Sequence, residues 1–322
     1  MPLVSIIVPT HDRAQMLKEA VDSALAQTFQ DFELIVVLNG ASAASVEMAN
    51  RLGANPKVKV VEMADDTLAA SRNFGLEFAS GEWIAFLDDD DIWLPDKLAT
   101  QLDAAVREGA DLVTCNFTTF NSDGELPSAG LTPLPSGLGF AEALMLANYV
   151  SGGSAVLVRA AAIRKLGGFD AKLRGCEDWD MWRRLSWDHT FCRLDRALVR
   201  YRRHGTNMTT NLDLVLQAEA QHFAKLLIDT PLKLRHMLPR AKRRFARLLL
   251  HNLTEQGVLD GHATHLYHVG FACYRMLGKL TGGLSGKLYR RLRDLLGARA
   301  RPKTARRLHI GNSDPRGERP RS

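Results

Sequence analysis

The sequence predicts an α/β fold: a mostly parallel, twisted sheet flanked by helices, with a helical C-terminal extension. Three observations predict it. Short apolar runs alternate with segments of helical spacing through the first third of the chain, which is typical of βαβ units. Polar residues follow several of these runs directly, where ligands bind at the carboxyl ends of parallel strands. Beyond residue 212, the apolar residues recur at helical spacing alone.

In the first half, strands and helices alternate in order. Leu17, Val21 and Ala24 have the spacing of one helix face, Gly53 ends a helix, and Pro95 is tolerated in the first turn of another. We expect strands at 3–8, 34–38, 58–61 and 83–87, and helices at 14–27, 43–52, 67–79 and from Pro95 onward.

A loop rich in Gly and Pro at 122–139 divides the chain after residue 121. We therefore expect one domain over 1–211, with halves 1–121 and 122–211. In the second half, strands are expected at 155–158 and 198–202, with helices near 159–166 and 177–185. A helical extension should follow at 212–298, and the Arg/Pro/Gly-rich tail at 299–322 is expected to be disordered.

Composition excludes several classes of protein. The four cysteines have no CxxC spacing, which excludes a zinc or disulfide framework and favours a reduced, cytoplasmic protein. The apolar N-terminus is interrupted by Ser5 and ended by Pro9, as in a buried strand and not a signal peptide. The sequence contains no run of eighteen apolar residues, so we expect no membrane-spanning helix.

The net charge of +6 is concentrated in the last third of the chain. Arginines and lysines cluster at 242–247, 290–293 and 299–307, and anionic lipid on the inner face of the plasma membrane is the partner that they favour. Nucleic acid is not expected, because the chain has neither a recognition-helix motif nor aromatic residues interleaved with the basic ones.

Four consecutive aspartates, Asp88 to Asp91, close the apolar run 83–87. Carboxylates crowded at the end of a buried strand repel one another and need a cation. Their hard oxygens select Mg2+ or Mn2+, ions that normally hold phosphates. The alternative is an exposed acidic turn that caps the helix near Pro95. Helix capping alone does not account for four adjacent carboxylates after a buried strand, because the helix gains little stability from so many.

Three polar segments follow predicted strands: His11-Asp12, Asn39-Gly40 and Asp88–Asp91. The carboxyl ends of parallel strands meet at one edge of the sheet, so these segments should line a single crevice. The sequence thus predicts metal-assisted chemistry on a nucleotide in that crevice.

These residues, with others in a fixed order, resemble an inverting family 2 glycosyltransferase of the GT-A fold. The resemblance covers roughly residues 3 to 210. The segments that carry it are Val4-Ser-Ile-Ile-Val-Pro-Thr10, Gln27-Thr-Phe29, Phe32-Glu-Leu-Ile-Val-Val37, Ser71-Arg-Asn73, Phe86-Leu-Asp-Asp-Asp-Asp91, Glu177-Asp178 and Tyr201-Arg-Arg-His204.

The resemblance implies a metal site at Asp88 and Asp90, with Asp90 the more direct ligand to an ion on the diphosphate. It assigns Asp89 and Asp91 to support of the ion or to the sugar, and His204 to the metal or the diphosphate. An imidazole suits Mn2+ better than Mg2+. The resemblance also places Arg72 beside the diphosphate or the acidic cluster, where a surface ion pair is the plainer alternative.

Glu177-Asp178 opens a Trp-rich helix, and the resemblance makes Asp178 the general base, with Glu177 as the alternative. A carboxylate at a helix N-terminus is expected to stay ionised. The plainer alternative for both residues is ordinary acidic charge at a helix start.

The nucleotide site is expected at Pro9, Thr10, His11 and Asp12, together with Asn39. The family commonly has two aspartates where this chain has Leu38-Asn39, and an asparagine amide can still pair with the imide of a pyrimidine base. His11 stands where an aromatic ring often stacks on the base.

The resemblance therefore implies a hexosyl transfer with inversion, from a nucleoside-diphosphate sugar, with UDP-sugars favoured, to a glycan or lipid-linked acceptor. Cell-envelope or extracellular polysaccharide synthesis is the expected setting. The alternative is a non-catalytic nucleotide-sugar-binding scaffold, which the altered Leu38-Asn39 pair motivates.

Overall fold

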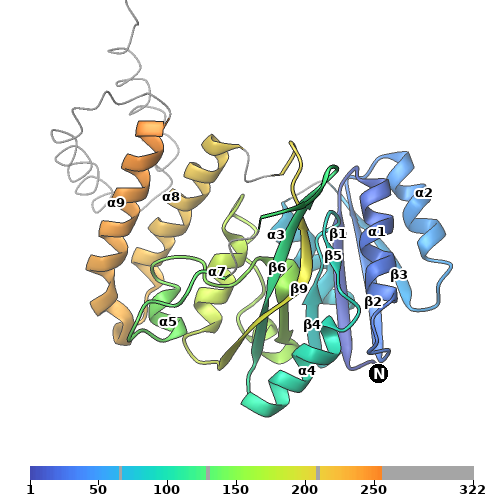
Figure 1. The fold of residues 1–322 in the computed structure, drawn as a ribbon, viewed down its shortest axis with the longest axis horizontal. Helices are drawn as coiled ribbons and strands as arrows, with labels where there is room; N and C mark the ends of the chain where they lie inside the picture. Colours follow the sequence, from blue (N-terminus) through green and yellow to red (C-terminus); the bar gives the residue numbers. More distant parts are fainter. Residues whose placement is uncertain (65–66, 128–130, 208–210, 256–322) are drawn as a thin grey trace, which may run out of the picture.

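The computed structural model describes residues 1–64, 67–127, 131–207 and 211–255. Helices cover both faces of a single sheet, and a pair of long helices lies beside it at the C-terminal end of the described chain (Figure 1). The strand order is β3-β2-β1-β4-β8-β6-β9-β5, with β7 paired to β6. The predicted tail at 299–322 and the 256–298 part of the predicted helical extension lie outside the described residues.

The first half of the sheet is parallel. β1 is buried at every position because helices pack on both of its faces, which explains its continuous apolar sequence. The strands are β1 (Val4–Thr10), β2 (Phe32–Asn39), β3 (Val58–Met63) and β4 (Trp83–Phe86), and their connecting helices are α1 (Ala14–Leu25), α2 (Ala43–Leu52) and α3 (Leu68–Phe78). The predicted elements of this half are confirmed to within a few residues.

The second half of the sheet is mixed. β8 (Val156–Arg159) runs antiparallel to both of its neighbours, β4 and β6 (Leu112–Asn121). β9 (Phe191–Arg202) is parallel to β6 and antiparallel to β5 (Ile92–Trp93), and β7 (Gly124–Leu126) closes a hairpin on β6. The α/β class is confirmed, but the expectation of a mostly parallel sheet holds only for its first half. β8 enters the sheet without a crossover helix that would set it parallel.

The sheet lies between two apolar layers. Alternate residues of β1 point to opposite faces: Ile6 packs on the side of α1, α2 and α4 (Lys97–Glu108), and Ile7 on the side of α3. The second face is also covered by α6 (Ala160–Lys165) and α7 (Glu177–Leu185), whose Trp182 is fully buried.

The C-terminal helices form a third apolar cluster with the segment around α5 (Phe140–Ala143). They are α8 (Leu212–Asp229), the 3-10 helix η3 (Leu232–Met237) and α9 (Leu238–Glu255). Phe223 of α8 stacks on Phe245 of α9, with ring centroids 4.4 Å apart. Within the described residues, no helix is long and apolar enough to span a membrane.

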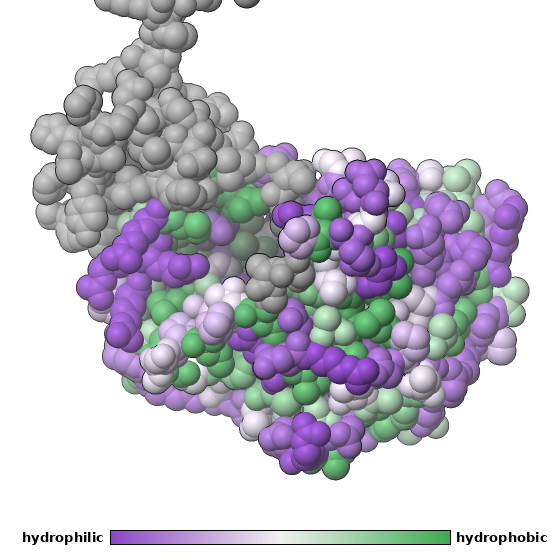
Figure 2. Space-filling model, in the orientation of Figure 1, coloured by the Kyte–Doolittle hydropathy of each residue, from purple (hydrophilic) through white to green (hydrophobic). Residues whose placement is uncertain are grey.

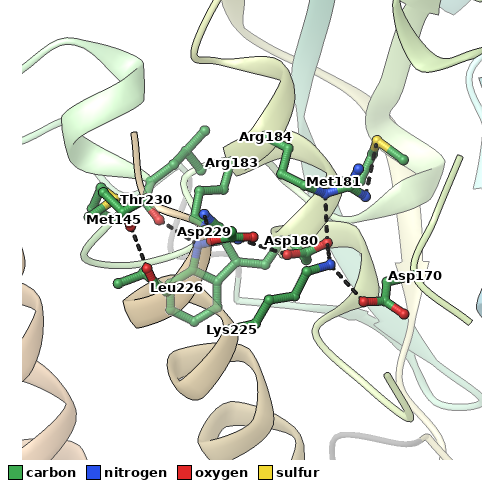
Figure 3. Close-up of polar contacts among 12 residues, drawn as sticks. Met145, Asp170, Asp180, Met181, Arg183, Arg184, Lys225, Leu226, Asp229 and Thr230 are labelled. Carbon is green, nitrogen blue, oxygen red and sulfur yellow. Dashed lines mark hydrogen bonds and ion pairs between the residues drawn. The ribbon is translucent and has the colours of Figure 1, made fainter. Parts of the chain in front are cut away.

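Buried ion pairs fix α8 to α7 (Figure 3). Arg183 reaches Asp180 and Asp229 at 2.8 and 2.9 Å, and Lys225 of α8 reaches Asp180 at 2.8 Å. Arg184 donates to the other side of the same Asp180 carboxylate, also at 2.8 Å. The side chains of Asp180 and Arg183 are fully buried, so this network sets where the C-terminal helices sit against α7.

Candidate active site

A cavity of about 580 Å3 opens at the carboxyl ends of β1 and β2. Of the residues predicted to bind the nucleotide sugar, Arg72 and Asp88 line a second cavity, and the others line this one: Pro9, Thr10, His11, Asp12, Asn39 and Asp89. The structure thus places these predicted residues at one crevice, as the topology required. Asp89 and Glu177 line the same cavity and connect it to the run of four aspartates and to the start of α7.

His11 and Asn39 are linked across the two strand ends. The Nδ1 atom of the half-exposed His11 ring lies 2.6 Å from the backbone carbonyl oxygen of Asn39. Asp12 adopts a left-handed backbone with φ 53° and accepts a hydrogen bond from the backbone N–H of Ser42; the Ser42 side chain and then its backbone lower the pKa of Asp12. Both ring and carboxylate are therefore held at the mouth of the cavity by neighbouring loops.

The four aspartates Asp88–Asp91, here called the acidic segment, are held by Thr10 of β1 and by Arg13, the residue that precedes α1. The Thr10 hydroxyl donates to Asp89 at 2.7 Å, and Arg13 donates to Asp89 at 3.0 Å and to Asp90 at 2.7 Å. Burial raises the pKa of Asp89 to about 6, although Arg13 and the Thr10 hydroxyl oppose the rise. Arg13, which the sequence analysis did not single out, is thus the cation that currently neutralises this pair of carboxylates.

Asp91 points away from the cavities. It is 2% exposed and accepts a hydrogen bond from the backbone N–H of Arg202 at 3.1 Å, which joins the segment to β9. Burial raises the pKa of Asp91 well above its ordinary value, and Asp88 and Asp90 add to the rise. Its role is to anchor the acidic segment to the sheet.

The predicted metal ligands separate into two groups. Asp90 and His204 come together, with Oδ2 and Nε2 3.0 Å apart, whereas Asp88 turns to Arg72. The hydroxyl of Thr206 lies 2.8 Å from Nδ1 of the His204 ring. The described part of the chain holds no cluster of three His, Cys, Asp or Glu residues arranged for a metal ion. Two protein ligands still fit Mg2+ or Mn2+, because such ions are usually held by one or two side chains plus phosphates and water.

Arg72 joins the acidic segment to the start of α7. Its guanidinium donates to Asp88 at 2.8 Å and to Glu177 at 2.9 Å, and the side chain is 2% exposed. Phe86 and Phe169 lie against it. Burial alone would lower the pKa of Arg72, but the two carboxylates outweigh burial and raise it. The surface ion pair considered as the alternative is therefore wrong, since this pairing is buried.

α7 begins at a strained position that directs its first two side chains into the cavities. Cys176, the residue before the helix, has φ 56°, a conformation unusual for a residue with a side chain. Glu177 is ion-paired to Arg72, whereas Asp178 accepts from the neutral amide of Asn148 at 3.2 Å and from the backbone N–H of Trp179 at 2.6 Å. The two adjacent carboxylates thus have different partners.

Burial raises the pKa of both Glu177 and Asp178, although Arg72 lowers each. The sequence predicts that the helix N-terminus favours the ionised carboxylates, whereas burial acts in the opposite direction. A raised pKa makes a carboxylate a stronger base once it is ionised.

A second cavity of about 490 Å3 adjoins the first. Asp88, Asp178 and Asn148 line it, and its far wall consists of residues of α8 and α9. Glu177 and the exposed Arg174 line both cavities, so the first opens beside the second at the start of α7. The sequence analysis missed Asn148 and Arg174. The position of Arg174 three residues before Glu177 was a usable signal, whereas nothing local marks Asn148.

Comparison with known proteins gives a family match. The model of the family described as "Glycosyl transferase family 2" matches residues 5–164, which include β1, the acidic segment and β8. The chondroitin synthase of Pasteurella multocida (strain Pm70) is 29% identical over 218 residues, covering 66% of this chain and 22% of that protein. The chain thus spans about a fifth of the length of this relative.

Solved structures give the same fold at low identity. The S. aureus TarS 1–349 complex with UDP-GlcNAc has a TM-score of 0.58 at 16% identity, covering 78% of this chain and 72% of that one. The mannosyltransferase PcManGT from Pyrobaculum calidifontis, in complex with GDP-Man and Mn2+, has a TM-score of 0.56 at 19% identity, covering 86% and 82%.

Proposed function

The chain belongs to glycosyl transferase family 2 and has the GT-A fold, and we propose that it transfers a hexose from a nucleoside-diphosphate sugar, with inversion, to an acceptor hydroxyl. The observation that carries the proposal is the position of Asp178. It lies in a cavity that adjoins the nucleotide cavity, its pKa is raised, and only neutral donors hold it. A non-catalytic binding scaffold has no need of such a carboxylate.

Asp178 is the general base of the proposal. Glu177 serves less well because its charge is matched by Arg72 at 2.9 Å. Asp178 takes the proton from the acceptor hydroxyl as that oxygen attacks the anomeric carbon from the side of the second cavity. Asn148 holds the carboxylate in orientation at 3.2 Å. General-base assistance of this kind contributes about 10^2 to 10^4-fold in rate.

The donor diphosphate lies between Asp90, His204 and Arg13 in the proposal. Asp90 and His204 would hold a divalent ion, Mn2+ or Mg2+, which supplies charge neutralisation for the departing diphosphate. Arg13 already pairs with Asp89 and Asp90, and its guanidinium would be able to donate to the phosphates of the donor from the same position. The Mn2+ in the PcManGT complex and the UDP-GlcNAc in the TarS complex support this donor chemistry.

We place the reaction in the cytoplasm, on a glycan or a lipid-linked acceptor in polysaccharide synthesis. Relatives named as polysaccharide synthases support that setting. The basic clusters at 290–293 and 299–307, which fall outside the described part of the chain, would then lie near an anionic membrane surface.

The experiment is to measure UDP release and UDP binding for Asp178→Asn and Asp90→Ala with a panel of UDP-sugars and Mn2+. Asp178→Asn should lose transfer by about 10^2-fold or more while it still binds UDP with Mn2+, because the base lies outside the nucleotide cavity. Asp90→Ala should lose both. Asp188→Asn, an exposed carboxylate paired with Lys233, is the matched control and should change neither. Near-normal transfer by Asp178→Asn would refute the base assignment.

A further inference from the structure

Four arginines of α9 share one face of the helix: Arg240, Arg243, Arg244 and Arg247. Their spacing of i, i+3, i+4 and i+7 brings the side chains together. All four are exposed, and together with Leu146 and Leu248 they line a cavity of about 510 Å3, here called the arginine groove. Hydrophilic residues cover this outer side of α9 at the left of the space-filling view (Figure 2).

The opposite face of α9 is apolar and packs on α8 and η3, which keeps the four arginines on the outer side of the helix. Ala241 is buried in the cluster that joins α8, η3 and α9, and Phe245 packs against it and stacks on Phe223. This packing fixes the rotation of the helix. Arg244 adds a hydrogen bond from Nε to the backbone carbonyl of Leu146 at 2.6 Å. The arginine groove therefore has a defined wall.

The positive charge of the groove is only partly offset: Glu142 acts electrostatically on Arg240 and Glu219 on Arg244, and neither is in ion-pair contact. Among the residues that the structure describes, no carboxylate forms an ion pair with any of the four arginines. Like charges at i+3 and i+4 destabilise a helix, so the array works against the stability of α9. A bound anion would remove that repulsion. Guanidinium groups bind phosphate through paired hydrogen bonds, and phosphate is the anion that best matches several of them at once.

The arginine groove continues into the cavity that holds Asp178. Leu146, Arg244 and Leu248 line both of them. A molecule that places a hydroxyl at Asp178 can therefore extend along the apolar wall of α8 and α9 into the groove. We propose that the acceptor is a phosphate-bearing saccharide, whose phosphate group binds in the arginine groove while its attacking hydroxyl lies at Asp178. This inference rests on the proposed function, since it names the class of acceptor for the same site.

A membrane surface is the other source of phosphate, and the connection between the two cavities favours the acceptor. The arginine groove shares Leu146, Arg244 and Leu248 with the cavity that holds Asp178, so a phosphate bound there can belong to the molecule whose hydroxyl lies at Asp178. The experiment distinguishes the two.

The test measures binding of sugar 1-phosphates to the full chain, with the nucleotide site saturated by UDP and Mn2+. The probes are the 1-phosphates of glucose, galactose, N-acetylglucosamine and mannose, each compared with its parent sugar by titration calorimetry. For at least one sugar, the phosphate should tighten binding about tenfold, and Arg243→Gln/Arg247→Gln should abolish that preference. Arg51→Gln/Arg235→Gln removes the same charge from exposed positions outside the groove and should keep it.

Sedimentation with phosphatidylglycerol and phosphatidylcholine vesicles forms the second arm. The groove variant and its charge-matched control should lose vesicle binding equally, if either loses any. If only the groove variant lost vesicle binding, the groove would be a membrane contact and the inference would be overturned. If the wild type showed no preference for the sugar phosphates, the groove would not bind the acceptor phosphate, which would also overturn it. Failure of the wild type to bind UDP at all would instead refute the proposed function, so the two failures are distinguishable.

Discussion

Replacing Arg72 by methionine should destabilise the protein and shift its pH profile together. The guanidinium is 2% exposed and bridges Asp88 and Glu177, so the variant leaves two carboxylates without their cation. Breaking a buried ion pair by removing one partner costs about 3–5 kcal/mol. For a domain of this size, that corresponds to a fall in Tm of about 6–20 °C.

The pH dependence has a definite sign. Arg72 lowers the pKa of Glu177 and Asp178, so its loss should raise both values further above the ordinary carboxyl range. A group whose folded pKa is raised stabilises the fold at low pH and loses that contribution as the pH rises through the folded pKa. The Tm difference between wild type and Arg72→Met should therefore shrink as the pH falls towards about 4. The acid limb of transfer activity should move to higher pH.

Arg72→Lys separates charge from geometry. An ammonium keeps the positive charge but makes a single point contact in place of the two directed ones. We expect it to restore most of the acid limb and only part of the Tm, measured by thermal unfolding and by UDP release across pH. An acid limb that stays unchanged in Arg72→Met would refute the claim that this cation sets the protonation of the carboxylate pair.

Two further predictions concern contacts around the same helix. Asp180→Asn should lower Tm because Arg183 loses its buried carboxylate partner. Burial raises the pKa of Asp180, but Arg184 and the other cations outweigh burial and leave it lowered, so the wild type should lose this stabilisation as the pH falls below about 4. The variant should show no such loss, and urea unfolding at two pH values would measure the difference. Gly153→Ala should lower the rate of transfer, since the new Cβ would lie 2.8 Å from the guanidinium of Arg72 and displace it from Asp88 and Glu177. Unchanged transfer kinetics would mean that the position of the Arg72 guanidinium is not critical.

Local sequence was enough to predict the nucleotide side of the site. Periodicity identified β1, β2 and β4, and parallel topology then required Thr10, Asn39 and the acidic segment to meet at one edge. Nothing beyond strand order was needed, because each of these residues follows its strand directly.

The remaining part depended on contacts that are distant in sequence. Asn148 donates to Asp178 from a segment that carries no local pattern. Arg202 lies in a predicted strand, but its contact with Asp91 depends on the pairing of β9 with β5, which periodicity does not give. β6 was not predicted either, because its sequence has no clear alternation: its first four residues and Phe120 are buried, and residues 116–119, three of them polar, are all partly exposed. Which of four adjacent aspartates faces which partner is decided by turn geometry, and composition carries no information about it.

The position of α7 explains why the extension beyond the family match belongs to the same site. At the start of α7, Glu177 and Asp178 face the two cavities, and on the same helix Asp180 and Arg183 form ion pairs with Lys225 and Asp229 of α8. A helix is rigid over that distance, so the docking of α8 fixes the wall opposite Asp178. An acceptor bound between them contacts both the family fold and the extension. Acceptor choice in this chain should therefore be set outside residues 5–164, by elements for which the family pattern makes no prediction.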